Sequence, residues 1–191
     1  MKKTSEPQFS KSTKEFRKEN KAKAIRISKG LTASESIGQL KKDTDLFILT
    51  YGQFSLVDAL IAVLDQIGPA HVTISTWTAA SAHLEKTAQL IESAEMLSFK
   101  MIVDRSFETR QPEYCEHMRH LFGAECVRAI RSHAKFMLIR NDEWNLVFRT
   151  SMNLNENPRL ENLEISDNLD FAEFFQVVVD EIFREVAVGE N

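Results

Sequence analysis

A histidine and a lysine, His133 and Lys135, lie two residues apart in a stretch that predicts a β-strand over residues 133–139. Side chains alternate along a strand, so both are expected to project from one face. A neutral imidazole beside an ammonium suits chemistry at phosphorus. The histidine can attack phosphorus or transfer a proton, and the lysine neutralises non-bridging oxygens. Alone the pair is a weak signal, because a strand histidine beside a lysine that extends to solvent has the same spacing.

Polar residues downstream are placed to join this pair. A turn over residues 141–143 predicts a hairpin whose second strand returns Thr150, Ser151 and Asn153 to the end where His133 lies. Hydroxyl and amide donors there could bind phosphate oxygens. Ordinary turn chemistry is the alternative interpretation of Ser151 and Asn153.

A second polar pair, Asn162 and Glu164, is expected on one face of the next strand, over residues 163–166. A carboxylate near a catalytic histidine fixes its tautomer and stabilises its imidazolium form. We therefore take Glu164 as the candidate partner of His133. A charge at a strand edge is the alternative interpretation of Glu164.

Taken together, His133-x-Lys135, Ser151-x-Asn153 and Asn162-x-Glu164 resemble the motif of the phospholipase D superfamily, in which H-x-K-x4-D is followed by G-S-x-N and N-x-E. Glu164 lies thirteen residues after Ser151, the usual spacing of the family. The resemblance covers residues 43–185. Two positions depart from it: Arg140 stands where the family has aspartate, and Thr150 replaces a glycine that permits close approach of the backbone to phosphate.

The resemblance implies a two-step phosphoryl transfer without metal or cofactor. A histidine forms a covalent phosphohistidine, and a second histidine protonates the leaving oxygen. The implied catalytic residues are His133, Lys135 and Glu164, and the implied phosphate-binding residues are Ser151, Asn153, Asn162 and Thr150. The chain carries one such motif and shows no internal repeat, so a complete site is expected at the two-fold axis of a homodimer.

The elements that must position these residues alternate between strands and helices, which predicts an α/β domain with a mixed sheet flanked by helices. Helix 56–67 should begin at a capping box formed by Ser55 and Asp58 and end at Gly68-Pro69. Pro158 is expected to start a short helix. Further strands are predicted over 45–50, 71–78, 99–103, 126–130 and 146–149, and further helices over 84–94, 112–122 and 171–183.

Charge is divided unevenly along the chain. Residues 1–42 hold 12 Lys/Arg against 4 Asp/Glu, a net charge of +8, whereas residues 43–191 hold 12 against 24, a net charge of −12. We predict a basic, partly flexible arm with a short helix over 1–42, followed by one domain over 43–191. A basic arm favours a polyanionic partner, although a merely solvated segment has the same composition. The cleft itself should gain positive charge from Lys135, Arg140, Arg149 and Arg159.

Composition excludes several classes. The 191 residues are 43% hydrophobic and 27% charged, as in ordinary globular domains. Two cysteines argue against a disulfide scaffold. No apolar leader follows Lys2-Lys3, and no apolar run approaches the ~18 residues of a membrane span, so a cytoplasmic protein without a transmembrane segment is expected. The spacing of Cys115, His117, His120 and Cys126 matches no standard zinc site, which makes zinc the weaker interpretation.

The favoured function is a metal-independent phosphodiesterase, a nuclease that hydrolyses DNA or RNA at a homodimeric composite site. The basic arm supports this choice, because lysines add sequence-independent affinity for nucleic acid. Two alternatives stay open. One is a phospholipase D-type lipid hydrolase whose arm binds anionic headgroups. The other is a catalytically silent nucleic-acid-binding module, which the departures at Arg140 and Thr150 permit.

Overall fold

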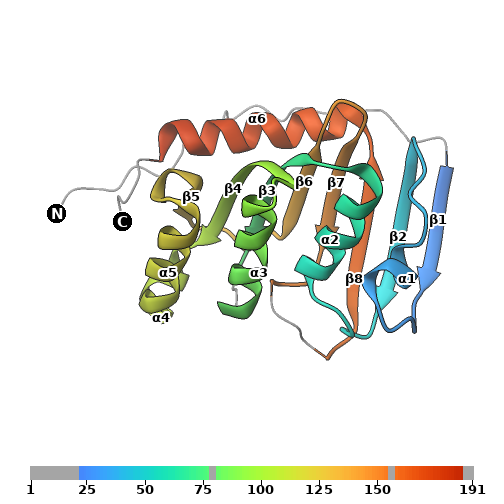
Figure 1. Ribbon diagram of the computed structural model, residues 1–191, viewed down its shortest axis with the longest axis horizontal. Coiled ribbons are helices and arrows are strands. Elements are labelled where there is room, and N and C mark those ends of the chain that lie inside the picture. The colour runs from blue at the N-terminus through green and yellow to red at the C-terminus, as the bar shows by residue number, and fades with distance from the viewer. Residues whose placement is uncertain (1–21, 78–80, 155–157, 187–191) are drawn as a thin grey trace.

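Helices cover both faces of one eight-stranded mixed sheet in the computed structural model, which describes residues 22–77, 81–154 and 158–186 (Figure 1). The strand order is β1-β2-β8-β7-β6-β3-β4-β5. β1–β2, β3–β4 and β4–β5 pair in parallel, and the four central pairings are antiparallel. The strands are β1 Ala22–Ile27, β2 Thr44–Thr50, β3 Ala70–Thr76, β4 Met96–Asp104, β5 Val127–Ile130, β6 Phe136–Arg140, β7 Asn145–Thr150 and β8 Glu161–Asp167.

The helices form two layers of unequal size. α2, α3 and α5 lie on one face of the sheet, and the long α6 crosses the other (Figure 1). The helices are α1 Ala33–Ile37, α2 Leu56–Ile67, α3 Ser81–Glu92, α4 Arg105–Arg110, α5 Pro112–Phe122 and α6 Leu169–Glu185, with a 3₁₀ turn at Ala124–Cys126. The expected α/β class is therefore confirmed.

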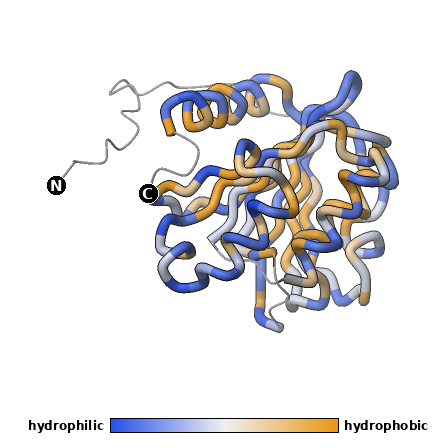
Figure 2. The backbone as a smooth tube through the Cα atoms, turned by 60° about the vertical axis from the view of Figure 1, so that its left-hand side comes forward, coloured by the Kyte–Doolittle hydropathy of each residue, from blue (hydrophilic) through white to orange (hydrophobic). Residues whose placement is uncertain are grey.

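Alternation along the strands divides the core between these two layers. Ile74 and Met137 pack with the α2, α3 and α5 side chains in the main cluster. Phe136 and Leu138, one residue out of phase with Met137, pack against α6 instead. Figure 2 shows the same division: the central strands are mostly hydrophobic, and hydrophobic and hydrophilic residues alternate along α6. Adjacent residues of a central strand therefore pack against different helix layers.

The α2 helix begins and ends where the sequence predicts. The Ser55 hydroxyl accepts a hydrogen bond from the Asp58 backbone N–H at 3.1 Å, and the Asp58 carboxylate accepts one from the Ser55 N–H at 2.9 Å. This reciprocal capping box satisfies donors that the first turn leaves without helical partners. Gly68 ends the helix with a φ of 76°, a left-handed conformation that glycine adopts without a Cβ clash.

Some local expectations were wrong. Residues 158–160 form no helix, because the chain enters β8 directly at Glu161. Two elements had no sequence signal strong enough to predict them. α4 is short and capped by Asp104, and β1 is a strand exposed on both faces that is held by its backbone pairing with β2.

The segment assigned to the basic arm is divided by the structure. Residues 1–21 lie outside the described residues. Residues 22–42 contain β1, which is the edge strand of the sheet, and α1, which packs against α2. α1 corresponds to the short helix expected within 1–42 and begins at a capping box between Thr32 and Glu35. None of the described helices combines the length and apolar composition needed to cross a bilayer.

Candidate active site

The candidate site lies at one edge of the sheet, where five strand ends meet. β2, β3 and β7 run in one direction and β6 and β8 in the other, as their antiparallel pairings require. The carboxyl ends of the first three strands therefore lie beside the amino ends of the other two. His133 and Lys135 precede β6, and Ser151 and Asn153 follow β7, so the hairpin brings these four residues to the same edge as expected.

His133 and Lys135 lie just before a strand and not within one. β6 begins at Phe136, which pairs with Ser75 of β3 and with Arg149 of β7. His133 is exposed and Lys135 is half-buried. The Lys135 carbonyl still accepts a hydrogen bond from the Thr150 N–H at 3.3 Å, which ties this segment to the end of β7.

The backbone around His133 is held from both sides. The Ser75 hydroxyl donates to the Ala134 carbonyl at 2.8 Å. The Asp104 carboxylate accepts from the Ser132 N–H at 3.1 Å, and the Ser132 hydroxyl accepts from the Ala134 N–H at 3.1 Å. These bonds fix the chain on each side of the imidazole.

Asp104 connects this segment to α4. Its carboxylate accepts from the Ser106 N–H at 2.9 Å and from the Ser106 hydroxyl, and so caps the helix. Partial burial works to raise the pKa of Asp104, but the hydrogen bonds from Ser106 and Ser132, with the charge of Arg110, together hold the pKa below its ordinary value. The Asp104 carboxylate is therefore ionised at neutral pH in the folded protein.

The His133 imidazole packs against an aromatic side chain. Its ring centroid lies 5.6 Å from that of Trp77, with the planes tilted by 56°. The guanidinium of Arg110 lies over the Trp77 ring, 4.1 Å from its centroid. Trp77 directly follows β3, and Arg110 is the last residue of α4. Neither residue belongs to the sequence motif that carries the resemblance.

Ser151 makes a compact contact with the start of β8. Its hydroxyl donates to the carboxylate of Glu161 and accepts from the Asn162 N–H at 3.0 Å, while its own N–H donates to the Asn162 carbonyl at 3.3 Å. Glu161 is the first residue of β8 and is only 8% exposed. A buried carboxylate therefore lies directly beside the Ser151 hydroxyl.

Glu164 lies on the other face of the sheet. Along β8 it alternates with the core-facing Leu163 and Ile165, and it forms an ion pair with Arg149, its cross-strand neighbour. Arg149 in turn lies over the ring of Phe171 in α6, 5.0 Å from its centroid. The structure therefore does not bring Glu164 to the face of the sheet that Lys135 shares with Met137.

The carboxylate that shares that face is Glu161. It is in phase with Leu163 and Ile165, both buried in the main core cluster. Asn162 is in phase with Glu164, so its backbone groups contact Ser151 while its side chain projects toward the α6 face. The signal for Glu161 was present in the sequence as this alternation.

Thr150 and Asn153 differ in whether their polar side-chain atoms already have hydrogen-bond partners. The Thr150 hydroxyl donates to the Asn162 carbonyl at 2.6 Å and accepts from the Met152 N–H at 3.0 Å, so it stabilises the turn. The Oδ1 atom of Asn153 is buried and has no hydrogen-bond partner among the described residues. A buried acceptor without a partner is costly, so Oδ1 is open to a donor on a ligand and Asn153 is the better candidate to contact one. A phosphate oxygen would take its hydrogen bond from the Nδ2 group of this side chain.

Only some of the basic residues expected around the cleft lie at this edge of the sheet. Arg140 lies at the far end of β6 from Lys135, where its Nε donates to Asn145 at 3.0 Å, so it does not reach this edge. Arg149 is on the α6 face. Arg159, two residues before β8, is at the right edge and exposed. Arg110, above Trp77, adds a cation that sequence reasoning missed.

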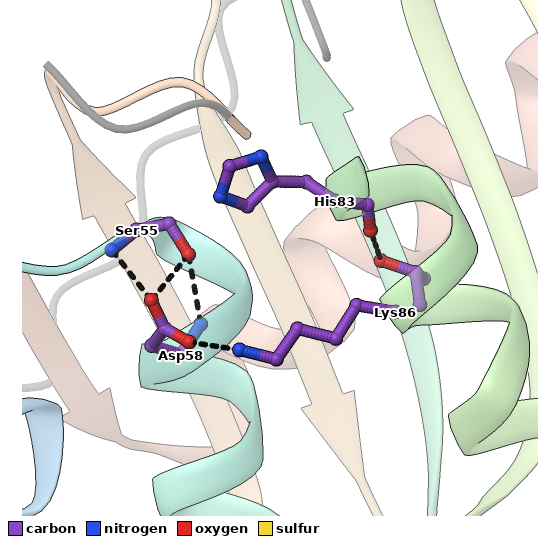
Figure 3. Close-up of polar contacts among 5 residues, drawn as sticks. Ser55, Asp58, His83 and Lys86 are labelled. Atoms are coloured by element: carbon purple, nitrogen blue, oxygen red, sulfur yellow. Dashed lines mark hydrogen bonds and ion pairs between the residues drawn. The ribbon is translucent and has the colours of Figure 1, made fainter. Parts of the chain in front are cut away.

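A second polar cluster lies at the N-termini of α2 and α3, which follow β2 and β3 and so begin at this edge (Figure 3). Lys86 donates to Asp58 at 2.5 Å. Burial raises the pKa of Asp58, but the bonds from Lys86 and Ser55 outweigh it and hold the pKa below its ordinary value. The imidazole of His83 projects from the first turn of α3 toward Ser55, and its Nδ1 is buried without a partner among the described residues. Sequence reasoning did not single out His83.

No three His, Cys, Asp or Glu side chains come together to hold a metal within residues 22–77, 81–154 and 158–186. Cys115 of the weaker zinc interpretation is buried in α5, and that burial, with the nearby charge of Glu108, raises the pKa of its thiol to about 11. The thiol is therefore protonated at neutral pH.

The chain has a phospholipase D-like α/β fold. No protein-family model and no curated protein matches its sequence. Among solved structures it is similar to Nuc, a phospholipase D family member from Salmonella typhimurium, with a TM-score of 0.50, 15% identity, and coverage of 77% of this chain and 99% of that one.

Two further structures resemble the chain less closely in shape. Polyphosphate kinase from Porphyromonas gingivalis has a TM-score of 0.49 and 16% identity over 71% of this chain and 26% of that one. TrmBL2, an archaeal chromatin protein, has a TM-score of 0.46 and 10% identity over 79% of this chain and 55% of that one. The chain thus spans about a quarter of the kinase and about half of TrmBL2.

Proposed function

We propose that this protein is a metal-independent phosphodiesterase of the phospholipase D type and that its substrate is nucleic acid. The observation that carries the proposal is the convergence, at one edge of the sheet, of His133 and Lys135 with Ser151, Asn153 and the buried Glu161. An imidazole, an ammonium and neutral donors are the groups that a phosphodiester transfer needs.

In the proposed reaction an imidazole nitrogen of His133 attacks phosphorus. A P–N bond forms as the P–O bond to the leaving group breaks, and a second imidazole gives its proton to the leaving oxygen. Water then loses a proton to that second imidazole, attacks phosphorus and breaks the P–N bond. Both histidines are restored. Lys135 and Asn153 hold the non-bridging oxygens, where charge develops.

Glu161 takes the role first expected of Glu164. It lies on the same face of the sheet as Lys135 and accepts from the Ser151 hydroxyl. In this arrangement the carboxylate accepts the hydroxyl hydrogen of Ser151 and so fixes that side chain, and its charge stabilises a neighbouring imidazolium.

Nucleic acid is the favoured substrate because of the charge division of the chain. The body carries −12 over residues 43–191 and repels a polyanion, whereas residues 1–42 carry +8. The exposed Arg110 and Arg159 add positive charge at the site edge. Cations spread along an arm match a polymer of phosphates better than a single headgroup.

The test is cleavage of labelled single- and double-stranded DNA and RNA in EDTA. The native chain should release fragments, and His133→Ala should abolish release because it removes the nucleophile. His120→Ala, which removes an exposed histidine in the last turn of α5, is the matched control and should retain the native rate. Binding without cleavage would overturn the proposal in favour of a silent module. Release of a lipid headgroup with no effect on nucleic acid would overturn it in favour of a lipid hydrolase.

The second imidazole is proposed to be His133 of a second copy of this chain. At low concentration the specific activity should then fall as dimers dissociate. Mixing His133→Ala with native subunits should lower activity more than dilution by inactive protein does. If specific activity is instead constant on dilution and His83→Gln abolishes cleavage, the composite site is contradicted and His83 supplies the second proton transfer.

A further inference from the structure

The Trp77 indole and the Arg110 guanidinium form a column at the candidate site, and the His133 imidazole packs beside it with its plane tilted by 56°. The His133 imidazole lies against the Trp77 indole with ring centroids 5.6 Å apart, and the Arg110 guanidinium lies 4.1 Å from the Trp77 ring centroid. Arg110 is exposed, and Trp77 is only half-buried. The column therefore lies at the surface of the protein, beside the proposed nucleophile, which is itself exposed.

The column is held by two elements. Trp77 directly follows Thr76, which is buried at the end of β3. Arg110 ends α4, and its Nε donates to the Ser106 hydroxyl at 3.2 Å. Asp104 bonds both Ser106 and the Ser132 N–H, so α4 and the segment that carries His133 share one anchor. One carboxylate thus links the helix that carries Arg110 to the segment that carries His133.

We propose that this column is a stacking site for an unpaired nucleobase, which makes single-stranded nucleic acid the preferred substrate; this rests on the proposed phosphodiesterase function. The base continues the column on the exposed guanidinium of Arg110. Bases stack on indole rings and on arginine guanidinium planes in proteins that bind single strands. A base held there places the phosphate of a neighbouring nucleotide near His133, and Arg110 supplies charge to the backbone.

Two other classes of substrate fit this column less well. A base inside a duplex is already covered on both faces by its neighbours, so it must unstack before it can join the column. A lipid headgroup offers a phosphate but no flat ring, and it gains nothing from the indole and guanidinium planes. The column therefore distinguishes substrates that present the same phosphodiester bond.

Intrinsic fluorescence tests the proposal directly, because Trp77 and Trp144 are the two tryptophans of the chain. Trp144 contacts Lys42 beside the turn at the opposite end of β6, away from His133. In Trp144→Phe the signal comes from Trp77 alone. A short oligothymidylate should quench it on mixing and bind about tenfold more tightly than an abasic oligomer of the same length. Equal quenching and equal affinity for the two oligomers would overturn the proposal.

Catalysis gives an independent readout. Trp77→Leu should lower kcat/KM about tenfold more for the oligothymidylate than for the abasic oligomer, and Trp77→Tyr should recover most of that difference. An equal loss on both oligomers would mean that Trp77 only positions His133, which would also overturn the proposal.

The two hypotheses fail in different ways. If both oligomers are cleaved equally and Trp77 fluorescence does not respond, the phosphodiesterase function stands and the stacking site is wrong. If oligothymidylate quenches Trp77 but neither oligomer is cleaved, the stacking site stands and the proposed catalytic function is wrong.

Discussion

Two glutamates in one strand differ only in the face to which they belong. Glu161 contacts Ser151 on the side of the sheet that carries α2 and α3, and Glu164 pairs with Arg149 on the side of α6. We predict that Glu161→Gln lowers kcat by about a hundredfold, because it removes the charge next to the phosphate-binding groups. Initial rates on labelled DNA measure the effect.

Glu164→Gln is the matched control for that substitution, since it makes the same chemical change three residues away. Its rate should stay within about twofold of the native rate, because it breaks only an exposed ion pair. A large loss in Glu164→Gln with normal cleavage in Glu161→Gln would restore the assignment based on spacing from Ser151.

Asp104 gives the molecule an acid-sensitive anchor. Its pKa is lowered in the folded protein from the ordinary value of 3.8, so the unfolded chain binds more protons in acid. The stability from this carboxylate is therefore complete above its ordinary pKa and is lost as the pH falls through the lowered value. We predict that Asp104→Asn lowers Tm at neutral pH and that its difference from the native Tm shrinks in this acid range.

Thermal unfolding followed by circular dichroism between pH 7 and about pH 3 measures this difference. Asp142→Asn, in the exposed turn after β6, serves as the control because it should not change the pH dependence. A Tm difference for Asp104→Asn that is constant over the whole range would show that its carboxylate charge contributes nothing to the anchor.

At the scale of elements, helix termini bring functional groups to the sheet edge. α2 begins at Ser55, whose side chain is completely buried and closes the capping box with Asp58. Ser55→Ala should cost about 1 kcal/mol of unfolding free energy, because it leaves backbone donors of the first turn without acceptors. Urea unfolding measures the loss.

Ser55→Thr is the comparison, since a threonine hydroxyl can also cap a helix. It keeps the acceptor but adds a methyl group in a buried position, so it should recover only part of the lost stability. Stability that is the same in native protein and Ser55→Ala would show that the cap contributes nothing.

The hairpin of β6 and β7 decides which polar residues meet. Because the two strands are antiparallel, the residue before β6 and the residue after β7 lie at one edge, and the residues near the turn lie at the other. Lys135 and Ser151 therefore converge, while Arg140, five residues beyond Lys135, is about 17 Å away along the strand. The departure from the family pattern at Arg140 thus affects the turn and not the site.

At the scale of the whole molecule, β1 separates the basic segment into two parts. Residues 22–27 pair with β2, and removing them would uncover a sheet edge. Deletion of residues 1–21 spares this strand and removes 7 Lys/Arg and 3 Glu. It should weaken DNA binding several-fold and flatten the dependence of log Kd on log salt concentration, because fewer counterions are released.

Fluorescence anisotropy with a labelled oligonucleotide at several salt concentrations measures both quantities. Replacing the Lys and Arg residues of the segment by glutamine, at unchanged length, is the control and should reproduce the deletion. Native affinity and an unchanged salt slope in both variants would mean that these cations do not take part in binding.

Local periodicity and spacing in the sequence predict most of the helices and strands and part of the candidate site. The apolar repeats of α2 and α6 and the strand runs that became β2, β3, β4 and β7 predict an α/β sheet without tertiary information. The hairpin geometry also predicts that His133 and Lys135 meet Ser151 and Asn153, because strand direction follows from one short turn. These conclusions depend only on interactions between residues close in sequence.

Tertiary structure decided which carboxylate and which flat side chains join the site. Glu161 takes the place expected of Glu164 in the candidate site because Ser151 contacts the first residue of β8, and the expected helix at Pro158 hid that start. Trp77 and Arg110 belong to separate parts of the chain that meet only when the sheet is assembled. Their convergence depends on strand order and helix packing, which no local sequence pattern records.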